Sequence, residues 1–324
     1  MSKAVCALLF VLELTVLVSV ARADAPTDST KNTLTVMLDQ AVNPNHAALV
    51  VAQEKGFFAA ENLQVELQVP THPDDPSKLA AVDKVDLAVS HQPQLHIDIN
   101  AGLPIKRIGT LMSTPLSALA VLKSSPIKTL ADLKGHKIGA SGTDLDKALL
   151  KALLAHANLK LEEVELVNIG TSPLPALLSG QVDAAVGISR NFDFNQMDLA
   201  KKPGRMFYSE EEGISPYDAL VLVAPRDRLG DPRLRRFLTA LEQATLYTLN
   251  HPDEAWQLFI SHHKELDDEL NRRAWRDTLP RLARRPAALD EVAYKRFAHF
   301  LAKQGVITVA LPVSNYAVQL PLPE

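Results

Sequence analysis

Short apolar runs alternate with amphipathic stretches along this chain from Thr33 onward. This alternation is typical of βαβ units and predicts a mostly parallel sheet flanked by helices. In the first half of the chain, the pattern predicts strands at 34–39, 65–69 and 85–90. Helices are predicted between them at 47–61 and 77–82.

The same order of elements is repeated about a hundred residues later. Strands are predicted at 136–141, 164–169 and 182–187, with helices at 144–157 and 173–178. The third strand of each half lies in a similar sequence, VDLAVSHQPQ at 85–94 and VDAAVGISRN at 182–191. We therefore expect two similar lobes, each built on its own parallel strands.

Two further apolar strands, at 118–122 and 219–224, lie between and after the two halves. We expect them to carry the chain from the first lobe to the second and back, so that they act as a hinge. The remaining residues are predicted to form helices at 232–249, 252–263, 267–278 and 290–304. The predicted fold is α/β, of the bilobal periplasmic-binding-protein type 2, with two doubly wound lobes joined by two crossing hinge strands and a helical C-terminal tail. The expected boundaries are 33–116 for the first part of lobe 1, 117–220 for lobe 2, and 221–324 for the return to lobe 1 with its helices.

The composition is that of an ordinary globular protein, with 47% hydrophobic and 22% charged residues among 324. A formal net charge of −4 gives no basic surface for nucleic acid, so we expect no nucleic-acid partner. Two small arginine clusters are interpreted as solvated helix faces. They comprise Arg272, Arg273 and Arg276, and Arg281, Arg284 and Arg285.

The N-terminus has the pattern of a secretory signal. Lys3 precedes an apolar run, and the small residues Ala21 and Ala23 flank Arg22, which predicts a signal peptide at 1–23 with cleavage before Asp24. A flexible segment at 24–32 would follow, and the protein would be exported to the periplasm. Glu13 within the apolar run leaves membrane anchoring as an alternative.

The single cysteine, Cys6, lies inside this predicted signal, so the mature protein would have none. That excludes disulfides, thiolate catalysis and thiolate metal sites. His262 and His263 are adjacent on a predicted helix and would point to different faces, which argues against a metal site there. We predict neither a metal nor a cofactor.

Polar residues follow the predicted strands, at the sheet edge where open α/β folds bind ligands. In lobe 1 these candidates are Asp39, Gln40, Asn43, His46, Ser90, His91 and Gln92. In lobe 2 and at the return hinge they are Ser141, Gly142, Thr143, Arg190, Asn191, Asp193, Tyr217 and Asp218.

Several of these candidates also have purely structural interpretations. Asn43 and Pro44 could form a turn that opens a helix with Asn45 as its cap, Thr143 with Asp146 fits a capping box, and His91 could be a packed core histidine. For Asp193 we favour a functional role, because it lies in an unusually polar stretch after a strand.

The charges near these strand ends favour one class of ligand. A receptor for anions would leave its helix N-termini free of acidic residues, whereas Asp144 and Asp146 occupy one here. Together with Asp39 and Asp193, they favour a neutral or cationic nitrogen heterocycle. Arg190 partly offsets this charge and could equally pair with one of these four carboxylates.

Several motifs resemble the substrate-binding proteins of ABC importers in the NMT1/THI5-like (SsuA/THI5-like) family. They are VVAQEKGFFAAENLQVEL at 50–67, SPIKTLADLKGHKIGASG at 125–142 and LLSGQVDAAVG at 177–187. Other motifs resemble the members that bind thiamin pyrimidine precursors, and the resemblance covers about residues 33–260. These are LDQAVNPNHAALVVA at 38–52, SHQPQLH at 90–96, RNFDFNQ at 190–196 and GISPYDALVLVA at 213–224.

This resemblance implies a monomeric clamp that closes on a formylaminopyrimidine or hydroxymethylpyrimidine and then docks on membrane permease subunits. The sequence departs from the family pattern at three places: Gln40 stands where the pyrimidine receptors carry Trp, Ala219 where they carry an acidic residue, and GASGTD lacks an aromatic residue. A stacking wall for the ring would then be missing, unless Phe192 or Tyr217 supplies it.

Two other functions are consistent with such a clamp. One is a transport or sensory binding protein for another solute, such as a sulfonate or a riboflavin-like compound. The other is the pyrimidine synthase of the same family, whose chemistry the resemblance links to a cysteine-rich iron motif and a lysine that bears pyridoxal phosphate. Cys6 is the chain's one cysteine, so we expect a protein that is not an enzyme.

Overall fold

The computed structural model describes residues 32–72, 75–171 and 173–321, and these fold around two five-stranded sheets. The strand orders are β2-β1-β3-β10-β4 in the first sheet and β7-β6-β8-β5-β9 in the second. The two orders correspond strand for strand, which confirms the predicted bilobal α/β fold. We call the part around the first sheet lobe 1 and the part around the second lobe 2. The predicted signal peptide, with Glu13 and Cys6, and the segment 24–31 lie outside the described residues.

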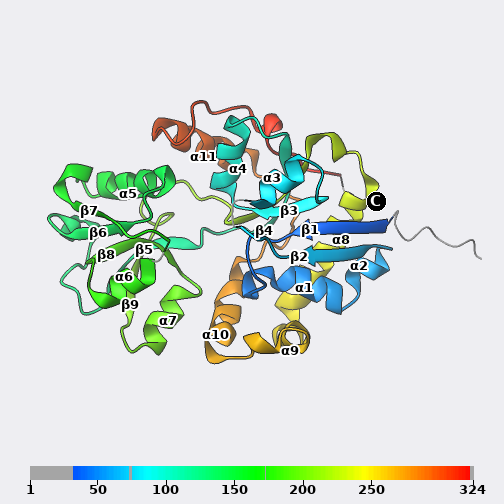
Figure 1. Ribbon diagram of the computed structural model, residues 1–324, viewed down its shortest axis with the longest axis horizontal. Helices are drawn as coiled ribbons and strands as arrows, with labels where there is room; N and C mark the ends of the chain where they lie inside the picture. Colours follow the sequence, from blue (N-terminus) through cyan, green and yellow to red (C-terminus); the bar gives the residue numbers. More distant parts are fainter. Residues whose placement is uncertain (1–31, 73–74, 172, 322–324) are drawn as a thin grey trace, which may run out of the picture. The chain divides into compact units, whose positions relative to one another are not determined.

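The elements follow one another as Figure 1 shows. The strands are β1 (Thr33–Met37), β2 (Gln64–Gln68), β3 (Leu87–Ser90), β4 (Ile105–Met112), β5 (Ser117–Leu122), β6 (Lys137–Ala140), β7 (Glu165–Asn168), β8 (Ala184–Ser189), β9 (Gly204–Tyr208) and β10 (Leu220–Pro225). The helices are α1 (Ala47–Glu54), α2 (Phe57–Ala60), α3 (Asp75–Ala81), α4 (Gln92–Asn100), α5 (Asp144–His156), α6 (Pro173–Ser179), α7 (Asp193–Leu199), α8 (Pro232–Asn250), α9 (Pro252–Ser261), α10 (Glu269–Thr278) and α11 (Glu291–Lys303). Within the described ranges, none of these helices combines the length and the apolar character that a membrane span requires.

Each lobe contains one strand that arrives from the other lobe. β10 lies antiparallel between β3 and β4, and β5 lies antiparallel between β8 and β9. These are the two predicted crossing strands, and each is a central member of a sheet. The chain therefore passes between the lobes in the two segments that precede them, at 113–116 and 209–219.

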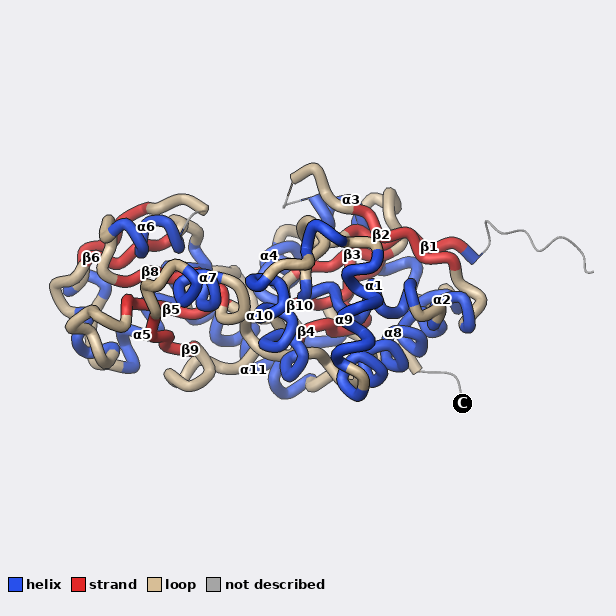
Figure 2. The backbone as a smooth tube through the Cα atoms, turned by 90° about the horizontal axis from the view of Figure 1, so that it is seen from below, coloured by secondary structure: helices blue, strands red, loops and turns tan. Residues whose placement is uncertain are grey.

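Helices cover both faces of each sheet, which is why the central strands are apolar on both sides. Along β1, Val36 packs into a core that includes α1 and α8, whereas the next residue, Met37, packs into a core with α3, α4 and α11. Figures 1 and 2 show α5 on one face of the second sheet and α6 on the other. Separate hydrophobic cores fill these two faces of lobe 2.

The structure differs from the predicted elements in a few places. The helix predicted at 47–61 is interrupted, because Gly56 adopts φ 82° between α1 and α2. The apolar pattern also failed to predict β4, β9, α4 and α7. In β4 the pattern is broken by Lys106 and by Arg107, which is buried.

Candidate functional site

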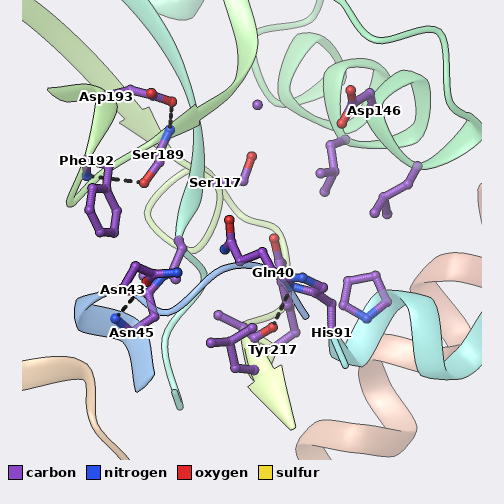
Figure 3. Close-up of a pocket in the computed structure, with 17 residues that line it drawn as sticks. Gln40, Asn43, Asn45, His91, Ser117, Asp146, Ser189, Phe192, Asp193 and Tyr217 are labelled. Atoms are coloured by element: carbon purple, nitrogen blue, oxygen red, sulfur yellow. Dashed lines mark hydrogen bonds between the residues drawn. The ribbon is translucent and has the colours of Figure 1, made fainter. Parts of the chain in front are cut away.

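A pocket of about 490 Å³ lies where strands of both lobes end (Figure 3). Its lining comes from the segments after β1 and β3 in lobe 1, from the end of β8 and the start of α5 and α7 in lobe 2, and from both crossing segments. This size is typical of small-molecule sites, which span about 300–1,000 Å³. The predicted site residues that line it are Gln40, Asn43, His91, Asp193 and Tyr217.

Asp39 and His46 lie behind this pocket as a buried pair. The Asn43 backbone N–H donates to His46 Nδ1 at 3.2 Å, so that nitrogen carries no proton. His46 Nε2–H then donates to Asp39 Oδ1 at 2.7 Å, and the two side chains are 0% and 7% exposed. Burial alone would raise the pKa of Asp39, but hydrogen bonds from His46 and His91 outweigh it and hold that pKa well below its usual range. Neither residue lines the pocket, and the pair fixes the loop that carries Gln40 and Asn43.

His91 stands between this pair and the pocket. Its Nδ1 lies 3.0 Å from the Ala219 carbonyl oxygen, and its Nε2 lies 3.5 Å from Asp39 Oδ2. The side chain is 52% exposed, so its interpretation as a packed core histidine is wrong. The predicted cap, Asn45, is wrong by two residues: Asn43 caps the short 3₁₀ turn Pro44–His46, accepting from the Asn45 N–H at 2.9 Å, and it lines the pocket as well.

Gln92 lies away from the pocket. Its side-chain carbonyl accepts the Asp218 backbone N–H at 2.7 Å, so it holds the segment that returns from lobe 2. Gln92 is almost fully buried and borders a second cavity, which Asp218 also lines. Ser90, another candidate, is buried and accepts a hydrogen bond from Ser77. Within lobe 1, the strand ends thus supply pocket residues and supporting residues side by side.

In lobe 2, the loop before α5 presents a residue other than those predicted. Thr143 is the N-cap of α5, with its hydroxyl accepting the Asp146 N–H at 3.2 Å, as the capping interpretation predicted. The Ser141 N–H and hydroxyl both donate to Asp146 Oδ2. Ser141 and Thr143 therefore orient Asp146, and it is Asp146 that lines the pocket. From the sequence, Asp146 was expected only to take part in a capping box and to contribute a charge near the cleft.

Arg190 and Asn191 also lie outside the pocket lining. Arg190 is buried, with Nη2 2.7 Å from Glu210 Oε1 and its guanidinium 3.9 Å from the centre of the Tyr208 ring. Its partner is Glu210 and not one of the carboxylates near the strand ends that the sequence suggested, and Glu210 is not among the residues that line the pocket. The buried Asn191 amide donates to Asn45 Oδ1 at 2.6 Å and to Thr278 Oγ1 at 2.8 Å. Asn191 therefore joins lobe 2 to lobe 1.

We expect Asn191→Ala to lower the free energy of unfolding by about 1–3 kcal/mol, since it leaves buried polar partners unpaired. Chemical denaturation measures this difference. Gln196→Ala, at an exposed position on the neighbouring helix α7, is the control and should change it by less than about 0.5 kcal/mol. Equal stability of the two variants would show that the bonds between Asn191, Asn45 and Thr278 contribute nothing.

Asp193 and the aromatic residues Phe192 and Tyr217 also line the pocket. Asp193 Oδ2 accepts the Ser189 N–H at 2.7 Å; burial raises the pKa of this carboxyl, and that hydrogen bond only partly opposes the shift. Phe192 and Tyr217 both line the pocket, and Tyr217 is stacked on Phe297 with ring centres 4.7 Å apart. Figure 3 shows Phe192 beside the cavity and Asp193 and Asp146 approaching it from different elements of lobe 2.

The charges that line the pocket have one sign. Asp146 and Asp193 contribute carboxylates, and none of the described lining residues is lysine or arginine. Asn45, Ser117 and Ser189 also line the pocket, although they were not predicted from the sequence as lining residues. Leu116, Leu145 and Leu149 supply much of the apolar wall. In the described part of the chain, no group of three or more His, Cys, Asp or Glu side chains is placed to hold a metal ion.

Comparison with known proteins gives a family match and named relatives. The model of a family described as NMT1/THI5-like matches residues 43–255. A Haemophilus influenzae protein, provisionally named as a thiamine biosynthesis protein, is 49% identical over 90% of this chain and 93% of its own length. The formylaminopyrimidine-binding protein of Halalkalibacterium halodurans is 27% identical over 76% of this chain and 75% of its own. A Legionella pneumophila relative, 26% identical over 79% of this chain and 82% of its own, is named as a 4-amino-5-hydroxymethyl-2-methylpyrimidine phosphate synthase.

A solved structure shows the same fold. The periplasmic aliphatic sulphonate-binding protein SsuA of Escherichia coli superposes with a TM-score of 0.72. It is 16% identical, and the match covers 90% of this chain and 94% of that protein. At this level of identity, the likeness establishes the architecture and leaves the ligand to the residues of the pocket.

Proposed function

Because this chain belongs to the NMT1/THI5-like family, we propose that it is the solute-binding component of an ABC importer for a thiamin pyrimidine precursor. The ligand would bind in the pocket between the lobes, held by groups of both at once. On this proposal the protein is exported to the periplasm, acts as a monomer and delivers its ligand to permease subunits.

The charge of the pocket lining carries this proposal. A sulfonate needs cationic or N–H donors, whereas the lining presents two carboxylates and, among its described members, neither lysine nor arginine. An aminopyrimidine offers an exocyclic N–H₂ donor, which a carboxylate accepts. Asp193 is the best placed acceptor, because it is desolvated and only its Oδ2 has a hydrogen bond within the described chain.

The other polar groups fit the ring nitrogens and the ring faces. Gln40 uses one side-chain N–H on Asp39 Oδ2 at 3.3 Å, which leaves its second N–H and its carbonyl for a ligand. Asn43 likewise uses one N–H on the Ala41 carbonyl. Phe192 and Tyr217 would contact the faces of the ring, in place of the tryptophan that Gln40 replaces.

We propose binding and not catalysis, although some relatives are named as synthases. The synthase chemistry implied by the family resemblance requires several cysteines, and this sequence contains Cys6 alone. The name of the Halalkalibacterium relative describes a binding protein.

A thermal-shift and calorimetric screen of the purified protein tests this function. We expect 4-amino-5-hydroxymethyl-2-methylpyrimidine at about one hundred times its Kd to stabilise the protein by about 2.7 kcal/mol, and ethanesulfonate and riboflavin to have no effect. Asp193→Asn should weaken binding by about tenfold, because it removes the charge from the acceptor.

The matched control is Asp198→Asn, which changes an exposed carboxylate on the same helix, α7, and should leave Kd unchanged. Stabilisation by ethanesulfonate or riboflavin, with none by any pyrimidine, would contradict the proposed ligand.

A further inference from the structure

We propose that the preferred ligand is an aminopyrimidine whose side arm carries a primary ammonium group, and that Asp146 binds this group. The inference rests on the proposed function and concerns the charge of the ligand. It distinguishes an aminomethyl arm, which is cationic at neutral pH, from the neutral hydroxymethyl and formamidomethyl arms.

Asp146 is held in place before any ligand arrives. Its Oδ2 accepts both the backbone N–H and the hydroxyl of Ser141, and its own N–H is bound by Thr143. Within the described chain its Oδ1 has no hydrogen bond. Because Asp146 lines the pocket, this oxygen is available to a donor inside it. A carboxylate fixed in this way loses little conformational freedom when it binds.

The neighbouring charges leave the carboxylates of lobe 2 uncompensated. His91 is the one lining residue of lobe 1 able to carry a positive charge, and Asp39 lies 3.5 Å from its Nε2. The nearby Arg190 is bound to Glu210 and stacked on Tyr208. Asp146 and Asp193 thus give the pocket two negative charges.

If Asp193 accepts the ring amino group, a hydroxymethyl or formamidomethyl arm can still donate a hydrogen bond to Asp146, but it leaves the charge of that carboxylate uncompensated. An ammonium group supplies three N–H donors and a compensating charge, so that both partners of the bond are ionised. We therefore expect selectivity to depend on the arm, with Asp146 as the residue that determines it.

Calorimetry with three 4-amino-2-methylpyrimidines that differ only at the 5-position tests this inference. We expect the aminomethyl compound to bind about tenfold more tightly than the hydroxymethyl and formamidomethyl compounds at neutral pH. Asp146→Asn should weaken binding of the aminomethyl compound more than that of the two neutral compounds and so remove this preference, while the Asn side-chain oxygen still accepts from Ser141.

The matched control is Asp144→Asn, which removes a charge from the same turn of α5 at an exposed position outside the pocket lining and should retain the preference. Equal or tighter binding of a neutral compound by the unmodified protein would overturn the inference and leave the proposed function intact. Retention of the preference in Asp146→Asn would show that another group binds the arm. Failure of all three pyrimidines to bind would instead refute the proposed function.

Discussion

Replacing Arg107 with alanine is expected to lower the free energy of unfolding by about 3–5 kcal/mol. The side chain is 1% exposed, yet it lies in the middle of β4. Its Nη2 donates to the Ala288 carbonyl at 2.5 Å and to Thr110 Oγ1 at 2.7 Å, and it makes a longer contact with the Pro286 carbonyl. Its Nη1 makes a longer contact with the Ala287 carbonyl. Removing the guanidinium would leave the buried Thr110 hydroxyl and the Ala287 carbonyl without this donor.

The effect should extend to the segment that returns from lobe 2. Thr110 Oγ1, which Arg107 contacts, donates to Asp218 Oδ2 at 2.6 Å, and Tyr294 donates to the same oxygen at 2.7 Å. Asp218 is next to Tyr217, a residue of the pocket lining. Arg107 is therefore linked through Thr110 to the carboxylate of Asp218, which lies next to one wall of the pocket.

The neighbouring Lys106 provides a matched control for this experiment. Its Nζ donates to the Ser314 carbonyl at 2.6 Å, but it does so at the protein surface. Lys106→Ala should therefore cost less than about 1 kcal/mol, and urea denaturation of both variants measures the difference. A loss below about 1 kcal/mol for Arg107→Ala as well would show that the buried network does not stabilise the fold.

Arg107 shows what the pattern of apolar and polar residues along the chain cannot predict. The apolar runs predicted the six repeated strands and the four tail helices at nearly their observed positions. A strand buried on both faces leaves a continuous hydrophobic run, and an amphipathic helix leaves an apolar stripe. β4 escaped prediction because Arg107 interrupts its apolar run, and a buried arginine that is hydrogen-bonded inside the protein cannot be told from a surface one by sequence alone.

The candidate site could likewise be predicted from the sequence only in part. Strand ends correctly located Gln40, His91 and Asp193 near one pocket, since parallel strands bring their carboxyl ends to one edge. The direction of each side chain was not predictable. Asn191 donates to Asn45 and Thr278, which are distant from it in the sequence. Ser141 instead donates to Asp146, because of the local geometry of the loop before α5.

Acid is expected to destabilise this protein through His96, a residue of α4. Its ring is 2% exposed and packs against Tyr316, with ring centres 4.6 Å apart, and against Phe297 at 5.8 Å. Burial lowers the pKa of His96 to about 4, from an ordinary value of 6.5. The Gln92 side-chain nitrogen lies 3.5 Å from its Nε2, and the Tyr294 ring is also close. Among the described residues, no carboxylate forms a hydrogen bond or ion pair with this ring that would compensate a charge on it.

The direction of the effect follows from the lower pKa in the folded state. Above pH 6.5 the ring is neutral in both states and contributes nothing to the pH dependence. As the pH falls from 6.5 towards 4, the unfolded chain binds a proton that the folded protein does not. The free energy of unfolding should therefore decrease, by about 2 kcal/mol at pH 5 and by about 3 kcal/mol when the loss is complete below pH 4.

Urea denaturation between pH 7 and pH 5 tests this prediction with two variants. His96→Phe removes the titrating group from an aromatic environment, and we expect its free energy of unfolding to fall by about 2 kcal/mol less over this interval than that of the unmodified protein. His299→Phe makes the same change at an exposed position of α11 and should retain the original pH dependence. Because the comparison uses the slope with pH, any constant packing cost of the phenylalanine cancels. An unchanged slope in His96→Phe would assign the acid sensitivity to other groups.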